Sequence, residues 1–160
     1  MDPRIEILKE TQLIGIRTTM SFAFNKTATL WQNFIPRRRE ISHVTGAELY
    51  SVEVFNDPMF FRNFDPTREF EKWAAVKVKD FDAVPEDMER LVIPSGMYAV
   101  FLYKGKPSEA QKTYQYIYSQ WIPGSEYTLD NRPHFALMGE KYKGEHPDSE
   151  EELWIPIRIK

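Results

Sequence analysis

One short signature occurs twice in the sequence and constrains the fold more than any other feature. The run from Trp31 to Pro36 and the run from Tyr118 to Pro123 both read aromatic-x-x-aromatic-Ile-Pro, and they lie 87 residues apart. Strand-like segments surround each run in the same order. A six-residue match alone can be coincidence, but its agreement with the order of the elements favours an internal duplication. A single duplication predicts two fused modules about a pseudo-twofold axis, because a solenoid needs at least three repeats.

Hydrophobic spacing predicts two helices and several strands around these runs. One helix is expected from Thr27 to the interruption at Pro36, and the other over residues 108–122, where apolar residues form one stripe before Pro123-Gly124. Shifting Val52 and Val54 by the same 87 residues places them in the corresponding later strand. Alternating or continuous apolar residues predict strands at 5–7, 14–20, 50–54, 70–78, 97–103, 134–142 and 153–159.

This order predicts an α+β fold of duplicated β-α-β-β modules with pseudo-twofold symmetry, in which an antiparallel sheet carries two main helices. We expect a single domain over residues 1–160, with pseudo-repeats at about 1–80 and 88–160. No long Gly/Ser-rich linker divides the chain.

Composition narrows the possible functions. The 21 Lys and Arg against 24 Asp and Glu give a net charge of −3, which argues against a polyanionic partner such as nucleic acid. The absence of cysteine excludes disulfides and thiolate chemistry, and the three histidines lack metal-ligand spacing. No nucleotide-binding or nucleophile motif is present, so we expect no cofactor, metal or motif-defined catalytic residue. Without an apolar run of membrane-spanning or signal-peptide length, we expect a cytoplasmic protein with no membrane partner.

Two charge runs have simple interpretations. Arg37-Arg38-Arg39 follows a helix end, where cations complement the helix dipole, and we favour a solvated helix terminus over an anion site. Glu150-Glu151-Glu152 is interpreted as a solvated turn before the last strand.

Aromatic residues, at 14% of the chain, remain to be explained by a core or by a site. In a regular 134–142 strand, Glu140 shares a face with Ala136, Met138 and Tyr142, whereas Trp154 points away from the aliphatic row of the last strand. If these strands are neighbours, a carboxylate could lie among rings, a combination that selects lipophilic cations. The alternative, that Trp154 caps the core and Glu140 is exposed, stays open.

The order of these motifs resembles the GyrI-like effector-binding domain, the small-molecule module of AraC-type and MerR-type multidrug-sensing regulators. The resemblance rests on runs that begin at Leu13, Leu30 and Tyr50, and in the second half on Gly96–Phe101, Tyr116–Tyr127, His134-Phe135 and Trp154–Ile157. It implies a central ligand cleft with a key glutamate on the penultimate strand. That position is Ala136 here, and Glu140 is the expected substitute; the aromatic positions carry over to Trp154 and Trp121. The lone-domain format also resembles cationic-drug-binding proteins of integron cassettes.

We therefore expect a stand-alone module that binds a lipophilic, cationic small molecule, with a protein partner or a homodimer also possible and no direct contact with nucleic acid. The alternatives are a hydrolase that uses a cleft glutamate against reactive electrophiles, and an interaction module like the family's gyrase inhibitors. The candidate ligand-binding residues are Glu140, Trp121, Trp154, Tyr142, Met138, Ala136, Tyr50 and Phe24.

Overall fold

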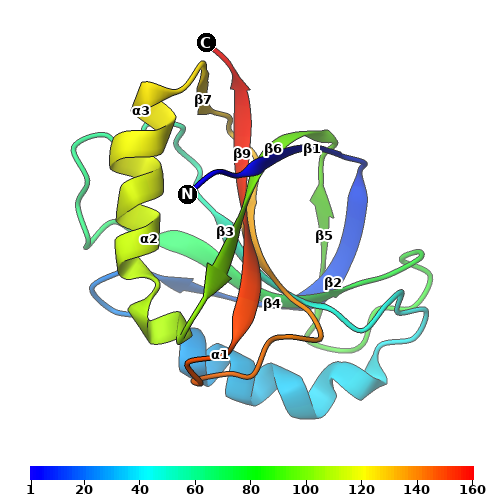
Figure 1. Ribbon diagram of the computed structural model, residues 1–160. Coiled ribbons are helices and arrows are strands. Elements are labelled where there is room, and N and C mark those ends of the chain that lie inside the picture. The colour runs from blue at the N-terminus through cyan, green and yellow to red at the C-terminus, as the bar shows by residue number, and fades with distance from the viewer.

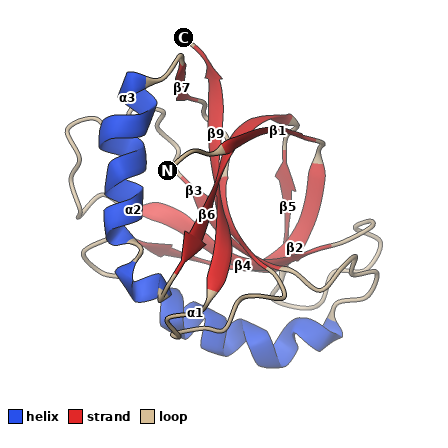
Figure 2. Ribbon diagram, viewed as in Figure 1, coloured by secondary structure: helices blue, strands red, loops and turns tan.

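An antiparallel sheet and two helical segments make up the protein, which a computed structural model describes over residues 1–160 (Figures 1 and 2). The sheet has nine strands in the order β1-β6-β9-β8-β3-β4-β2-β5, with β7 paired to β9 beside this path. The strands are β1 (Arg4–Leu8), β2 (Thr11–Met20), β3 (Leu49–Val54), β4 (Phe70–Lys77), β5 (Glu89–Ile93), β6 (Gly96–Lys104), β7 (Tyr127–Leu129), β8 (His134–Met138) and β9 (Glu150–Ile159). The α+β class and the antiparallel sheet are as predicted.

The duplication is visible in the register of the central strands. In the antiparallel pair β3–β8, Ser51 lies opposite Ala136, and the remaining pairs are arranged symmetrically about these two residues. Strands β1, β2 and β3 are therefore related to β5, β6 and β8 by an offset of 85 residues, whereas β4 is related to β9 by an offset of 79. The predicted offset of 87, which made Gly139 and Lys141 the equivalents of Val52 and Val54, is wrong for the sheet. The halves also exchange strands, because β1 pairs with β6 and β5 pairs with β2.

Three strand predictions need correction. The strand predicted over 134–142 ends at Met138, because the chain turns at Glu140 and Lys141. The short strands β5 and β7 were not predicted. The sequence of β5, Glu-Arg-Leu-Val-Ile, alternates poorly, and β7 has only three residues, so hydrophobic periodicity carries little signal for either.

Both predicted helices are present, each with a departure from regular α-helix. The first comprises α1 (Thr27–Phe34) and a 3₁₀ segment, η1 (Ile35–Glu40), that begins at the interruption before Pro36. The second runs through η2 (Pro107–Glu109), α2 (Gln111–Tyr116), a π-helical segment η3 (Ile117–Trp121) and α3 (Ile122–Gly124). A π-helical turn inside an α-helix is rare and is frequent at functional sites. No helix is both long and apolar enough to cross a membrane.

The helices contact one face of the curved sheet (Figure 2). Apolar clusters are buried on both faces of the sheet. On the helix side, α1 packs through Leu30 and Phe34 onto β2 and β4, and the second helical segment packs through Ile117 and Ile122 onto β6 and β9. The other face of the curved sheet buries a largely aromatic core without a helix. That core contains Leu13, Tyr50, Val52, Trp73, Ala75, Ile93, Tyr98, Val100, Phe135 and Trp154.

Candidate functional site

The central part of the helix-side face carries small and polar side chains instead of an apolar core. At its centre are Ser51 of β3 and Ala136 of β8, which lie directly opposite each other. On one side of this pair, Glu53 lies between Lys72 of β4 and His134 of β8. On the other side, Glu151 of β9 lies opposite Tyr103 of β6 and is next to Met138 when the β8–β9 register is continued. We call these residues (Ser51, Glu53, Lys72, His134, Ala136, Met138 and Glu151) the central strip.

One buried ion pair compensates part of the charge in the strip. The Lys72 Nζ lies 3.6 Å from Glu53 Oε1, and both side chains are largely buried, at 10% and 14% exposure. Alternation in β3 and β4 directs the two side chains to the same face, and the register makes them direct neighbours. Burial of both charges costs solvation, so this pair needs its mutual attraction to be tolerated.

The second carboxylate, Glu151, is buried and has no hydrogen-bond or ion-pair partner. It is 8% exposed, and burial raises its pKa from 4.5 to about 7, with Glu53 and Glu145 adding to the rise and Lys72 opposing it. Three tyrosines, Tyr103, Tyr114 and Tyr142, are close enough for its charge to raise the pKa of each phenol, although burial is the larger cause. A carboxylate in such surroundings gains stabilisation from any cation that enters.

The π-helical segment places a further tyrosine, Tyr118, over the strip. Tyr118 Oη and His134 Nδ1 are 2.9 Å apart, and burial lowers the pKa of His134 to about 3, so this imidazole is neutral at physiological pH. The ring of Tyr118 stacks on Phe61 with centroids 4.0 Å apart and an angle of 11°. Phe61 belongs to the loop that follows β3, so this loop and the second helix meet above one end of the strip.

The residues predicted to form a site on the penultimate strand lie partly within β8 and partly beyond its end. Ala136 and Met138 are buried in the central strip. Glu140, predicted to share their face, lies in the exposed turn after β8. Tyr142 is half-buried beyond that turn and lies near Glu151.

Two of the predicted aromatic residues lie on the opposite face of the sheet. Trp154 pairs with Phe135 and stacks on it at 5.2 Å, and Tyr50 belongs to the same core. The Trp154 ring already contacts a cation, because the Arg4 guanidinium lies 5.8 Å from the ring centroid. The same guanidinium is paired with Glu152. The structure therefore does not bring Trp154 together with Met138 or with the turn that carries Glu140.

The other two predicted aromatics, Trp121 and Phe24, belong to different segments. Trp121 packs edge-on against Phe101 on the helix side, with ring centroids 5.2 Å apart. Phe24 lies in the loop before α1 and is 71% exposed. Phe101, which Trp121 contacts, is not a residue of the central strip.

Glu53 and Glu151 were missed as candidates, although a signal existed for each. The run Glu150–Glu152 is not a turn but the beginning of β9. Extending the aliphatic row Leu153, Ile155 and Ile157 by two residues places Glu151 on the same buried face. Glu53 alternates with Val52 and Val54 in the predicted strand, but alternation alone does not tell a solvent-facing residue from one that faces a covering helix.

One group of residues has metal-ligand chemistry. The ligand atoms of His43, Asp80 and Asp82 lie within 4.8 Å of one another, and His43 Nδ1 is 2.8 Å from Asp80 Oδ1. His43 and Asp82 are exposed, and exposed groups of this kind are common without an ion, so the group does not define a metal site.

Comparison with known proteins matches the chain to one family and to one curated relative. Residues 1–158 match the family model described as the GyrI-like small molecule binding domain. Over 159 residues the chain is 28% identical to the transcriptional regulator BrlR of Pseudomonas aeruginosa, with 98% of this chain but only 56% of that regulator covered. The chain thus spans little more than half the length of this curated relative.

Two solved structures share the fold. The structure of SAV2435 bound to tetraphenylphosphonium superposes with a TM-score of 0.73 at 17% identity, covering 99% of this chain and 94% of the other. An integron cassette protein from the mobile metagenome of Vibrio cholerae has a TM-score of 0.67 at 16% identity, covering 98% and 96%.

Proposed function

Because the chain belongs to the GyrI-like small-molecule-binding family, we propose that it binds amphipathic, cationic small molecules over the central strip, between α1 and the second helical segment. The finer points, the positive charge of the ligand and the residues that bind it, rest on the site itself. In this proposal Glu151 provides the counter-charge, and the tyrosines around it provide aromatic faces.

The observation that carries the proposal is the unpaired, buried carboxylate of Glu151. Lys72 is already engaged by Glu53, 3.6 Å away, so it leaves Glu151 without a partner of its own. A bound cation would compensate the ionised carboxylate, and cation–π contact with tyrosine rings would contribute roughly 0.5–2 kcal/mol more. Ser51 and Ala136 leave the floor between the two charged groups free of large side chains.

The relatives are consistent with this chemistry. SAV2435 was solved with tetraphenylphosphonium, a lipophilic cation, and the curated relative BrlR is a transcriptional regulator. By analogy we propose that the present chain acts as a ligand-responsive module in transcription regulation. The stacked rings of Phe61 and Tyr118 lie over one end of the strip, and we expect them to move when a ligand of this size enters at that end.

Titration calorimetry at pH 8 with tetraphenylphosphonium and with neutral triphenylphosphine oxide tests the proposal. We expect the wild type to bind the cation at least 10-fold more tightly than the neutral compound. Glu151→Gln should weaken cation binding at least 10-fold and leave the weak binding of the neutral compound unchanged, because only the charge is removed.

The matched control is Glu150→Gln, which removes the same charge from the adjacent residue on the other face of β9. This variant should bind the cation as the wild type does. Equal binding of the neutral and cationic compounds by the wild type, or equal losses in the two variants, would contradict the proposal.

A second function is favoured by the pKa of Glu151, which burial raises to about 7 and which therefore suits a general base near neutral pH. In a hydrolase, this carboxylate would take a proton from water while the water oxygen attacks an epoxide carbon, and the breaking C–O bond would leave an alkoxide that takes the proton back. Hydrolysis of styrene oxide, measured as the rate of diol formation, tests this function. Turnover that rises with an apparent pKa near 7 and is lost in Glu151→Gln would support it, and no turnover above the uncatalysed rate would exclude it.

A further inference from the structure

A cavity of about 290 Å³ opens beside η1, at the start of β3, outside the central strip. Its apolar wall includes Ile41, Leu49 and Val76, and its polar rim includes Arg38 and Arg39. We propose that this cavity, the arginine cavity, is a second binding site and that it takes small amphipathic anions, such as an aromatic sulfonate or carboxylate.

The duplication shows that the arginine cavity has an equivalent in the other half of the chain. Val44 pairs with Val78 in an isolated bridge, just as Leu129 pairs with Ile157 in β7–β9. With the 85-residue offset of the central strands, Gly46 corresponds to Asn131 and Leu49 to His134. These residues of the second half line the small cavity at the start of β8, so the two cavities occupy equivalent places.

The equivalent cavity is filled, and the arginine cavity is not. At the start of β8 the remaining space is about 10 Å³, because Phe55, Phe60 and Phe61 of the loop after β3 line and close it. The loop after β8, which would close the arginine cavity by symmetry, contributes no lining residue. A space of 290 Å³ approaches the volume of small-molecule sites, whereas 10 Å³ holds at most about one water molecule.

The rim of the arginine cavity carries free positive charge. Arg37 is held by Glu40 at 2.9 Å and by the Glu86 carbonyl at 2.7 Å. Arg38 and Arg39 have no ion pair and no side-chain hydrogen bond to the protein, and both line the cavity. Two arginines that line one cavity suit a carboxylate or sulfonate, because each guanidinium offers paired N–H donors to such a head group.

Glu48, on the opposite wall, limits how strongly anions bind. Its carboxylate lies against Gly46, where a side chain would overlap it and where φ is +79°, a value that favours glycine. The charged lining is therefore two arginines against one glutamate. A net positive rim over an apolar wall matches an amphipathic anion and not the cationic ligand proposed for the central strip.

The test uses 1-anilinonaphthalene-8-sulfonate as the anion. Its binding to the full chain is measured by calorimetry and by fluorescence. We expect one site whose affinity falls at least 10-fold in the double variant Arg38→Gln/Arg39→Gln. Filling the cavity with Ala47→Phe should also weaken binding at least 10-fold, and Glu48→Gln should strengthen it 2–5-fold. The loss in the double variant corresponds to two removed guanidinium groups, and the gain in Glu48→Gln corresponds to one removed repulsive charge.

Two controls separate this site from bulk charge and from the central strip. Lys26→Gln/Arg62→Gln removes two exposed cations elsewhere and should leave the affinity within 2-fold, and Glu151→Gln should do the same. The inference is overturned if the wild type fails to bind the sulfonate at 1 mM, if the two double variants lose affinity equally, or if Glu151→Gln weakens binding as much as Arg38→Gln/Arg39→Gln. Circular dichroism melting of each variant confirms that it is folded.

Discussion

The two halves of the molecule share a backbone plan but differ in the side chains at equivalent positions. Ser51 corresponds to Ala136 at the centre, and one step outward Lys72 corresponds to Glu151. The fold therefore provides a pair of equivalent positions on either side of the centre of the strip, and here they carry opposite charges. Lys72 is compensated within its own half by Glu53, whereas Glu151 is not compensated, and this difference creates the candidate cation site.

The same comparison explains why equivalent positions are not interchangeable. Gly15 of β2 lies opposite Ala75, and its equivalent Val100 of β6 lies opposite Trp154. A Cβ at Gly15 would overlap the Ala74 carbonyl oxygen and Ala75, so β2 and β4 approach each other too closely at this position for a side chain. Exchanging residues between halves tests which differences are structural and which belong to the site.

Gly15→Val, which gives the first half the residue of the second, should have the largest effect. The overlap with β4 backbone leaves no room for relaxation, so we expect a loss of at least about 4 kcal/mol in the free energy of unfolding, or roughly 10 °C or more in Tm. Chemical denaturation measures this loss. Gly139→Ala, at a glycine with nothing within 4 Å of a Cβ, is the control and should be near neutral. A mild effect of Gly15→Val would mean that β2 and β4 can separate.

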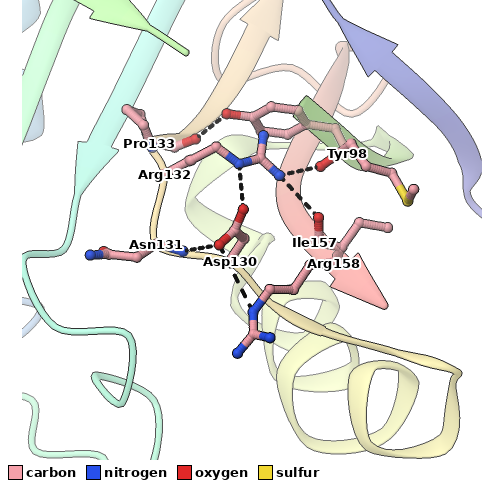
Figure 3. Close-up of polar contacts among 8 residues, drawn as sticks. Tyr98, Asp130, Asn131, Arg132, Pro133, Ile157 and Arg158 are labelled. Atoms are coloured by element: carbon pink, nitrogen blue, oxygen red, sulfur yellow. Dashed lines mark hydrogen bonds and ion pairs between the residues drawn. The ribbon is translucent and has the colours of Figure 1, made fainter. Parts of the chain in front are cut away.

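Arg132→Ala, which gives the second half the residue that occupies the equivalent position Ala47, should have the next largest effect. The Arg132 guanidinium donates hydrogen bonds to Asp130 Oδ2 at 2.8 Å and to the carbonyl oxygens of Met97 and Ile157 at 2.6 and 3.0 Å. Figure 3 shows this guanidinium among Tyr98, Asp130 and Ile157. The guanidinium also lies 4.7 Å from the centroid of the Tyr98 ring. Removing it leaves two carbonyls without this donor, so we expect a loss of about 2–3 kcal/mol.

Arg158→Ala is the matched control for Arg132. Its side chain is 63% exposed and its Nε is 3.9 Å from Asp130, so the loss should stay below about 0.5 kcal/mol. Equal losses in the two variants would show that the charge near Asp130, and not the buried network of Arg132, stabilises this loop.

The difference between Lys72 and Glu151 should also appear in the pH dependence of stability. The pKa of Glu151 is raised from 4.5 to about 7 in the folded chain, so between these pH values the folded state holds a proton that the unfolded state has released. Stability from this group is therefore present at low pH and is lost as pH rises toward and through 7, by about 1–3 kcal/mol. Glu151→Gln should remove this loss.

Comparing the free energy of unfolding of the wild type with that of Glu151→Gln across pH 5–8 separates the contribution of Glu151 from that of His134. The pKa of His134 is lowered to about 3, so this residue acts in the opposite direction and destabilises the fold as pH falls below about 6.5. Because His134 is present in both proteins, its contribution cancels in the difference. A pH-independent difference between wild type and Glu151→Gln would contradict the ionisation assigned to Glu151.

The sequence predicted most of the fold but only part of the candidate site. Strand and helix positions follow from local periodicity, and the repeated aromatic-x-x-aromatic-Ile-Pro run indicated the duplication. The strand register did not follow, because the helices are related by the 87 residues between Trp31 and Tyr118, whereas β3 and β8 are related by 85 residues and β4 and β9 by 79. Loop lengths between helix and strand account for such a shift, and no periodicity reports them.

The site residues depended on which strand face meets the helices. Ala136 and Met138 were placed correctly relative to each other because they are two residues apart. Trp154 was expected near them, but its side chain follows Phe135 to the opposite face, which only the β8–β9 register reveals. Buried Glu151 looked like a solvated residue because it is one of three consecutive glutamates, and only its place in β9 distinguishes it.

Glu140→Gln should have the smallest effect, and it decides between the carboxylate expected from sequence and the one proposed from the structure. Glu140 is exposed in the turn after β8, where a bound cation would gain little from its charge because water screens the interaction. We expect the affinity of Glu140→Gln for tetraphenylphosphonium to stay within 2-fold of that of the wild type, whereas Glu151→Gln should lose at least 10-fold. Calorimetry under the same conditions measures both variants. A loss in Glu140→Gln that equals or exceeds the loss in Glu151→Gln would move the site to the β8 turn and would restore the alternation that predicted Glu140 beside Met138.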